Sequence, residues 1–404
     1  MAGEDRTVRA APLAAVAVAC AIAVTATVAF LAPTIAFPGD ELFGDFRVTI
    51  WEPGQELLSG RDPMRAVDDE YNGGIYPPAA IVATLPISAL PYDIAVVVWL
   101  VALLAGVAGA LYLCGVRDWR CYAAAFASPP VVAGLAYGNV SLLVVLGIAG
   151  VWVMRDRPWR SGLLLGFVIA TRLFPWPVVV WLLFTRRIRA AAVAAASSMV
   201  FSFMGWLGVS FHRIGDFPAV TRSNASEFVD QGVSVASIVA NLGGSSKLIG
   251  VALVIALALT LAVAARCRHD DLACFSWSIT AALFSSPIVW GHYFAMLLVP
   301  IAVASPRLSR AWLLPYLTAP QLTGTFEAGQ KIVDATSGVL FACLTSILFF
   351  RRRTSQKNSN QVADLFEGLA TYFIILDGPA KIDVLNPPER RKIRLNADGF
   401  NAFC

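Results

Sequence analysis

Long apolar segments, separated by short basic ones, cover most of this chain. The first, residues 10–32, is long enough to cross a lipid bilayer, which takes about 20 apolar residues. Later apolar segments cover residues 92–114, 121–154, 161–184, 188–210, 248–265, 272–304 and 312–350. Several of these are long enough to form a hairpin of two helices. The pattern predicts an all-α polytopic membrane protein with about 11–12 spanning or half-spanning helices.

Composition supports the same class and excludes several others. Hydrophobic residues make up 57% of the 404 residues and charged residues 14%, whereas soluble domains are about a quarter charged. The seven cysteines are scattered and form no C-x-x-C pair, so we expect neither a disulfide framework nor a zinc site. The sequence has no Walker loop, which disfavours chemistry driven by a cytosolic nucleotide. The net charge of +4 is small, and we expect no nucleic-acid partner.

Basic residues beside apolar segments mark the cytoplasmic face of a membrane protein. They cluster at Arg117/Arg120, Arg155/Arg157/Arg160, Arg186/Arg187/Arg189, Arg266/Arg268, Arg307/Arg310 and Arg351/Arg352/Arg353. If these clusters and the N-terminus are cytoplasmic, residues 32–77 and 211–247 form two extracytoplasmic loops of a transmembrane domain covering residues 1–353. Residues 354–404 then form a cytoplasmic tail, with a short helix expected near residues 362–373. The expected location is the plasma membrane.

The same orientation places the tips of the predicted hairpins on one side. Segment 161–184 begins and ends at a basic cluster and contains Pro175 and Pro177, which predicts a broken, partly penetrating hairpin. Residues 78–91 fit either a re-entrant helix or a thin span. The residues expected together on the extracytoplasmic side are Asp45, Tyr76, Asn139, Arg172, Gln231 and His292.

The first extracytoplasmic loop is strongly acidic, with nine Asp and Glu residues between Asp40 and Pro78. A carboxylate on a loop near the membrane surface can take a proton from a hydroxyl group, and Asp45 is our candidate for that role. An ordinary solvated acid or a helix cap is the alternative, and Asp40 and Glu41 compete for the same role. A divalent metal is a further option because carboxylates suit Mg²⁺ or Mn²⁺, although no spacing requires one.

Two further polar residues stand inside apolar surroundings. Placing the charge of Arg172 in an apolar segment costs free energy, and its guanidinium can bind phosphate oxygens with two hydrogen bonds. The alternative is an arginine that reaches the interface or pairs structurally with an acid. His292, between two apolar runs, can donate to a phosphate or orient a hydroxyl group, or it can be a packing residue.

The order of the motifs resembles that of a known family. The motifs are G-D-F-R-V at residues 44–48, L-L-S-G-R-D-P-M at 57–64, I-Y-P-P at 75–78, Y-G-N-V-S at 137–141, G-L-L-L-G-F-V-I-A-T-R-L-F-P at 162–175, R-R-I-R-A-A at 186–191 and S-P-I-V-W-G-H-Y at 286–293. Over residues 10–350 the chain resembles glycosyltransferase family 87 of the GT-C class, polyprenyl-phosphate-sugar-dependent mannosyl- and arabinofuranosyltransferases. The resemblance implies a GT-C membrane fold, a lipid-linked sugar donor and a catalytic aspartate at Asp45.

These observations lead to one hypothesis and two alternatives. The hypothesis is an inverting transfer of mannose, or of arabinofuranose, from a polyprenyl phosphate to a glycolipid or cell-envelope polysaccharide, with Asp45 as base. The candidate substrate-binding residues are Arg47, Tyr76, Asn139, Arg172, Gln231, His292 and Tyr293. A lipid flippase or transporter is disfavoured because no second broken hairpin repeats the first. A non-catalytic scaffold that binds polyprenyl phosphate is the other alternative.

Overall fold

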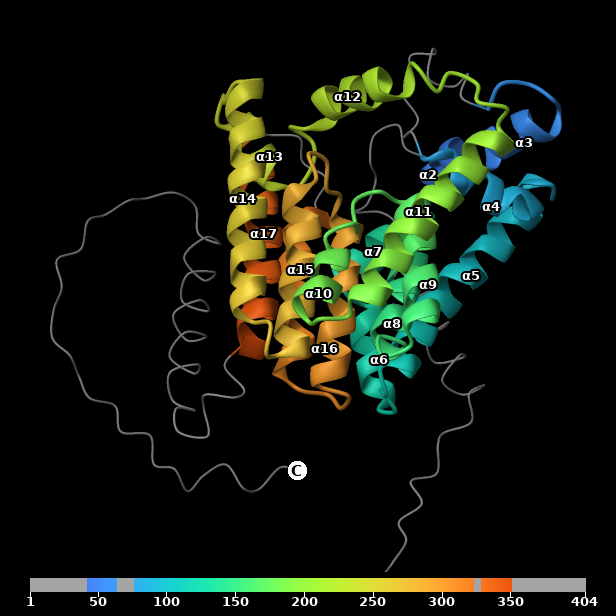
Figure 1. Ribbon diagram of the computed structural model, residues 1–404. Coiled ribbons are helices and arrows are strands. Elements are labelled where there is room, and N and C mark those ends of the chain that lie inside the picture. The colour runs from blue at the N-terminus through green and yellow to red at the C-terminus, as the bar shows by residue number, and fades with distance from the viewer. Residues whose placement is uncertain (1–41, 64–75, 323–327, 351–404) are drawn as a thin grey trace, which may run out of the picture. The chain divides into compact units, whose positions relative to one another are not determined.

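The computed structural model describes residues 42–63, 76–322 and 328–350, which form helices joined by short turns and loops (Figure 1). No strand occurs within these ranges, which confirms the predicted all-α class. The chain divides into two compact units, Met1–Arg352 and Arg353–Cys404, and every described residue belongs to the first. The predicted first span, both chain termini and the tail with its expected short helix lie outside the described residues, as do Asp40 and Glu41.

The helices follow one another closely. Within the first predicted loop, residues 32–77, the structure has three short elements: α2 (Gly44–Phe46), the π-helical turn η1 (Arg47–Trp51) and α3 (Glu52–Leu58). Next come α4 (Pro78–Ser88), α5 (Tyr92–Leu113), α6 (Trp119–Phe126), α7 (Pro129–Ala136), α8 (Ser141–Val153), α9 (Pro158–Thr171), α10 (Val178–Phe184) and α11 (Ile188–Gly208). The rest are α12 (Phe217–Phe228), α13 (Val235–Asn241), α14 (Ser246–Arg266), α15 (Asp271–Ser285), the 3₁₀ turn η3 (Gly291–Leu297), α16 (Leu298–Ala304), the 3₁₀ segment η4 (Arg310–Leu322) and α17 (Ala328–Phe350).

Within the described ranges, four helices are long and apolar enough to cross a membrane. They are Tyr92–Leu113, Ile188–Gly208, Ser246–Arg266 and Gly329–Leu348. Shorter apolar helices cover Pro78–Ser88, Ser141–Val153, Asp271–Ser285 and Gly291–Ala304. These lengths support a polytopic membrane protein, and the larger number of half-spanning helices stays a prediction.

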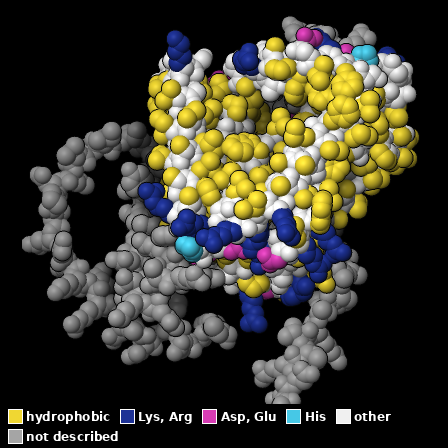
Figure 2. Space-filling view, viewed as in Figure 1, with side chains coloured by type: hydrophobic (Ala, Val, Ile, Leu, Met, Phe, Trp, Pro, Cys, Tyr) yellow, Lys and Arg dark blue, Asp and Glu magenta, His cyan; other side chains and the backbone are white. Residues whose placement is uncertain are grey.

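The outer surface of these helices is apolar. Figure 2 shows hydrophobic side chains covering the middle of the visible face, with lysines and arginines gathered below them. On α11 the exposed large side chains include Met199 and Phe203, and on α14 they include Val254 and Leu259. An apolar face of this extent is stable in contact with lipid and not with water, which agrees with the membrane class.

Three of the predicted hairpins have short turns in the structure, whereas the turn of the fourth, within residues 312–350, includes residues outside the described ranges. Helices α6 and α7 lead to the turn at residues 137–140, and α8 returns. Helix α9 ends at Thr171, residues 172–177 form an irregular turn, and the short helix α10 completes the broken hairpin. Helix α15 leads to residues 286–290, and η3 with α16 returns. For residues 78–91 the sequence fitted either a re-entrant helix or a thin span, and the structure has the single helix α4 there.

Small residues let α9 and α11 pack closely. A Cβ added at Gly162 would lie 2.8 Å from the Ala190 carbonyl oxygen, and one added at Gly166 would lie 2.8 Å from the Ala194 carbonyl oxygen. Glycines four residues apart thus bring two backbones together, as is common between membrane helices. This contact fixes the helix that ends next to Arg172.

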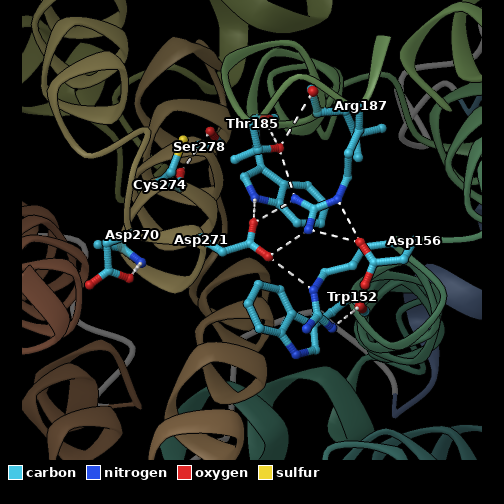
Figure 3. A network of polar contacts seen from close by, with 12 residues as sticks. Trp152, Asp156, Thr185, Arg187, Asp270, Asp271, Cys274 and Ser278 are labelled. Atoms are coloured by element: carbon cyan, nitrogen blue, oxygen red, sulfur yellow. Dashed lines mark hydrogen bonds and ion pairs between the residues drawn. The ribbon is translucent and has the colours of Figure 1, made fainter. Parts of the chain in front are cut away.

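A network around Asp271 joins three turns at the basic end of the bundle (Figure 3). Its Oδ2 accepts from Arg155 Nε at 2.9 Å, and its Oδ1 accepts from Arg187 Nη1 at 2.7 Å and from Trp181 Nε1 at 2.8 Å. Arg187 also donates from Nη2 to Asp156 Oδ1 at 3.0 Å. The carboxylate therefore ties the α8–α9 and α10–α11 turns to the start of α15, and it neutralises part of the arginine cluster.

Replacing Asp271 with alanine should destabilise the fold, because two partly buried guanidinium groups and an indole N–H lose their acceptor. Charge-assisted contacts of this kind are worth roughly 2–4 kcal/mol together after allowance for their partial exposure. The expected result is a lower melting temperature of the detergent-solubilised protein. Asp270→Ala is the matched control because Asp270 only caps α15, through Ala273 N at 3.1 Å. An equal loss in both variants would contradict a special role for the network.

Candidate functional site

The segment that carries Asp45 is anchored to the turn between α7 and α8 through backbone hydrogen bonds. Phe43 N donates to the Ala136 carbonyl oxygen at 2.8 Å, and Phe46 N donates to the Tyr137 carbonyl oxygen at 3.3 Å. These two contacts lie on either side of Asp45. What the sequence presented as a polar loop is therefore a short helical element at this point, and its carboxylate is directed by the neighbouring turn.

Gly138 makes this close approach available. Its φ of +66° lies in the left-handed region that favours glycine, and a Cβ there would lie 2.6 Å from Phe43 Cδ1. Its carbonyl oxygen accepts from Trp99 Nε1 at 2.6 Å, and the Trp99 ring stacks on Phe46 at 5.2 Å between centroids. The turn is thus held from both sides, and the next residue, Asn139, has a fixed position.

Asn139 is the centre of the polar cluster. Its Nδ2 donates to Asp45 Oδ2 at 2.6 Å and to the Tyr76 hydroxyl at 3.0 Å. Its Oδ1 accepts from Arg172 Nη2 at 3.1 Å and from Ser141, through N at 2.8 Å and Oγ at 2.6 Å. One amide therefore connects the Asp45 carboxylate with the Arg172 guanidinium, although the two residues lie 127 positions apart in the sequence.

Arg172 is 8% exposed and follows the last residue of α9. Its guanidinium carbon lies 4.0 Å from the Tyr76 ring centroid and 5.1 Å from the Tyr293 ring centroid. Phe174 supports this arrangement by stacking on Tyr293 at 4.7 Å. The buried Nε has no hydrogen-bond partner within the described part of the chain, so this group can still donate to a ligand.

His292 is 3% exposed and borders the same cluster. Its ring lies 4.9 Å from the Tyr293 ring and 6.1 Å from the Tyr137 ring, measured between centroids. Its Nε2 is buried without a hydrogen-bond partner among the described residues. Together with Arg172 Nε, the cluster thus holds two buried nitrogen atoms that have no hydrogen-bond partner among the described residues.

Burial raises the pKa of Tyr76, so this hydroxyl keeps its proton.

The structure brings together most of the predicted site residues. Those that join one cluster are Asp45, Tyr76, Asn139, Arg172, His292 and Tyr293. Arg47 instead pairs with Glu52, at 3.3 Å between Nε and Oε1. The Gln231 side chain is exposed, and no contact places it in the cluster.

The second predicted loop, residues 211–247, contacts the segment that precedes His292. Val233 N donates to the Val289 carbonyl oxygen at 2.7 Å, and Ser234 Oγ donates to the Pro287 carbonyl oxygen at 3.0 Å. Two residues of the cluster were missed from the sequence, Ser141 and Phe174. Both lie in motifs quoted above, at Y-G-N-V-S and R-L-F-P, but serine and phenylalanine in apolar segments carry no distinguishing signal of their own.

Metal ligands do not gather in the described residues. No group of three or more His, Cys, Asp or Glu side chains with metal-binding geometry occurs in residues 42–63, 76–322 and 328–350. The Asp45 carboxylate accepts a hydrogen bond from the Asn139 amide, and the cation in the cluster is the Arg172 guanidinium. The chemistry of these residues suits an oxyanion and a hydroxyl group.

The cluster and the Asp271 network lie at opposite ends of the same helices. Helix α8 leads from the Asn139 turn to the turn that holds Arg155, α9 leads from that turn to Arg172, and α15 begins at Asp271 and leads towards His292. In Figure 1 the short elements α2 and α3 lie at the top of the bundle, and α6 and α16 lie at the bottom. The protein is thus a polytopic helical membrane protein with a partly buried acid–amide–arginine cluster at the end opposite its arginine-rich turns.

Comparison with known sequences identifies the family. The sequence model of glycosyltransferase family 87 matches residues 75–290, more than half of the chain, and the chain belongs to this family. Asp45 lies outside the matched range, so its role is argued from geometry. No solved structure matches the chain.

Three curated relatives are mycobacterial. A polyprenol-phosphate-mannose-dependent alpha-(1-2)-phosphatidylinositol pentamannoside mannosyltransferase of Mycobacterium tuberculosis is 31% identical over 153 residues, which are 35% of this chain and 34% of that protein. The protein of the same name in Mycolicibacterium smegmatis is 27% identical over 243 residues, 55% of this chain and 58% of that protein. A phosphatidylinositol mannoside mannosyltransferase of the same species is 27% identical over 221 residues, covering 48% and 50%. The chain therefore spans between a third and three-fifths of the length of the curated relatives it matches.

Proposed function

We propose that this protein transfers a sugar from a polyprenyl-phosphate donor to a glycolipid of the cell envelope. The observation that carries the proposal is the arrangement of Asp45 and Arg172 around Asn139, with Nδ2 on the carboxylate and Oδ1 on the guanidinium. A transferase of this kind needs a proton acceptor for the attacking hydroxyl group and a cation for the departing phosphate. Both groups are present in one cluster, in which Arg172 is buried and Asp45 is half-buried.

Asp45 is the proposed general base. Its Oδ2 is fixed by Asn139, and fixing one oxygen orients the carboxylate without removing its capacity to accept a proton. It takes a proton from the acceptor hydroxyl as that oxygen attacks the anomeric carbon. A single displacement of this kind inverts the anomeric configuration, and the polyprenyl phosphate leaves with its bonding electron pair.

Arg172 and His292 are the proposed phosphate-binding groups. The guanidinium is held between two tyrosine rings, and its Nε is available. The neutral or protonated imidazole can donate one further hydrogen bond from a nitrogen atom. The adjoining residues Leu173 and Trp176 are 50% and 42% exposed, so the turn that carries Arg172 also presents apolar surface suited to a polyprenyl chain. The rings of Tyr76 and Tyr293 lie against the Arg172 guanidinium.

The proposed orientation puts this site on the extracytoplasmic face. The arginine-rich turns lie at the other end of α8, α9 and α15, and basic residues favour the cytoplasmic side. The donor favoured is polyprenol-phosphate mannose and the acceptor a phosphatidylinositol mannoside, because the relatives' names specify these substrates. Arabinofuranose stays an alternative sugar.

The test incubates the full chain in proteoliposomes with radiolabelled polyprenol-phosphate mannose and a phosphatidylinositol mannoside. Label on the acceptor, with inverted anomeric configuration, is the expected result. A parallel reaction with polyprenyl-phosphate arabinofuranose decides the sugar, and addition of a chelator decides metal dependence. Movement of the lipid between leaflets without transfer would support a flippase, and binding without either would support a scaffold. Each of these two outcomes would contradict the proposed transferase.

A further inference from the structure

We propose that Asn139 is a positioning residue, which keeps Asp45 and Arg172 apart and oriented, and that it does not contact the substrates. The inference rests on the proposed function and assigns a role within the same site. It revises the expectation from sequence that Asn139 binds substrate. The geometry that supports it is the complete use of the Asn139 amide by protein groups.

A primary amide has two N–H donors and an oxygen with two lone pairs. In Asn139 the two donors go to Asp45 and Tyr76, and the oxygen accepts from Ser141 and Arg172. The side chain is 2% exposed. No hydrogen-bonding capacity remains for a sugar or a phosphate. A residue in this state acts through the groups that it holds.

The direction of the amide is fixed by its neighbour. Ser141 N–H can only donate, and it donates to Asn139 Oδ1 at 2.8 Å. A flipped amide would place its NH₂ group against this N–H, which leaves two donors facing each other. The oxygen therefore faces Ser141, and the NH₂ group must face Asp45. The donor nature of one backbone group thus decides which end of the amide meets the carboxylate.

The amide also separates two opposite charges. Arginine and carboxylate groups within reach of one another form a bidentate pair, in which both lose much of their reactivity. Here Arg172 Nη2 reaches the amide oxygen at 3.1 Å, while Asp45 Oδ2 accepts from the amide nitrogen at 2.6 Å. The neutral spacer lets Asp45 accept a proton and leaves Arg172 Nε for the phosphate.

The other charged and titratable groups around Asp45 do not replace this role. The Tyr76 hydroxyl accepts from Asn139 at 3.0 Å, and the ring centroids of Tyr76 and Tyr293 lie 4.0 Å and 5.1 Å from the Arg172 guanidinium carbon. Arg47, two positions along the same segment, pairs with Glu52. Asn139 hydrogen-bonds to both the carboxylate and the guanidinium.

The test compares Asn139→Ala and Asn139→Asp with the wild-type full chain. The first measurement is affinity for polyprenyl phosphate without a sugar. In Asn139→Ala, Arg172 turns to Asp45, and affinity should fall about 3–10-fold. The second is the pH dependence of mannose transfer. In Asn139→Asp two carboxylates share a proton, so the acid limb of the profile should move up by about one pH unit or more.

A residue that touched only the sugar would leave both measurements unchanged, and that result would overturn the inference. Ser141→Ala should shift both in the same direction but less, because it removes the Oγ–H donor to Asn139 Oδ1 while the backbone N–H that fixes the direction of the amide remains. Ser161→Ala is its matched control, since Ser161 is equally buried but bonds only to backbone carbonyls of its own helix. Asn241→Asp is the control for the introduced charge.

The two measurements separate this inference from the proposed function. Wild-type protein that binds polyprenyl phosphate but transfers no mannose would overturn the transferase, and the affinity comparison would still decide the role of Asn139. Wild-type transfer with unchanged Asn139 variants would overturn only the positioning role. Melting temperatures close to the wild-type value show that the variants are folded.

Discussion

Asp45→Asn is expected to reduce sugar transfer by about 10²–10⁴-fold, because an amide cannot take the proton of the acceptor hydroxyl. The substitution keeps the size of the side chain. Asn139 Nδ2 can still donate to the new amide oxygen, as it now donates to Asp45 Oδ2 at 2.6 Å. The surrounding contacts should therefore persist, and affinity for polyprenyl phosphate should stay within a few-fold of wild type.

The measurement is initial-rate transfer from radiolabelled polyprenol-phosphate mannose in proteoliposomes, beside a binding curve for the lipid phosphate. Glu56→Gln is the matched control, since Glu56 lies in the same segment between Gly44 and Leu58 and pairs with Arg61 at the surface. An exposed ion pair contributes little, so this variant should keep its activity. Full transfer by Asp45→Asn would remove Asp45 from the mechanism.

Arg172→Ala should weaken binding of the donor and of sugar-free polyprenyl phosphate by about 10–100-fold. The guanidinium is buried between Tyr76 and Tyr293, and a charge-assisted hydrogen bond in such a place is worth about 1.5–3 kcal/mol. Turnover should fall as well, since the same cation stabilises the charge that develops on the departing phosphate.

Arg172→Lys separates charge from shape. A lysine keeps the positive charge but lacks the planar fork that binds two phosphate oxygens, so it should restore part of the affinity and less of the turnover. Arg160→Ala, at the other end of α9, is the control for loss of one arginine from the same helix. Unchanged affinity for the lipid phosphate in Arg172→Ala would contradict its assigned role.

Much of the architecture could be predicted from local patterns. Apolar length and the basic clusters indicated the hairpins whose turns lie at residues 137–140, 172–177 and 286–290, and the structure has those turns. This works because backbone groups in lipid must bond within helices, and because charged residues stay at helix ends. The resemblance in motifs pointed to the family that the comparison then identified.

Local patterns were insufficient where a contact depends on three-dimensional packing. The first predicted loop appeared in the sequence only as an acid-rich segment, whereas residues 44–58 are helical and this segment bonds to the turn after α7. Arg47 and Gln231 shared motifs or loops with site residues, yet Arg47 pairs with Glu52 and Gln231 is exposed. Neighbours in sequence point in different directions on a helix or turn, so a motif cannot tell which of its side chains faces the site.

The sequence by itself determined the membrane class, the hairpin order and the grouping of polar residues at the hairpin turns, since hydrophobic length and charge placement act locally. Only the tertiary structure decided that Asp45 and Arg172 meet through Asn139. That contact needs the positive φ of Gly138, the close packing of α9 on α11 and the donor N–H of Ser141 at once. Each is weak or invisible as a sequence signal, because its effect arises from segments far apart in the chain.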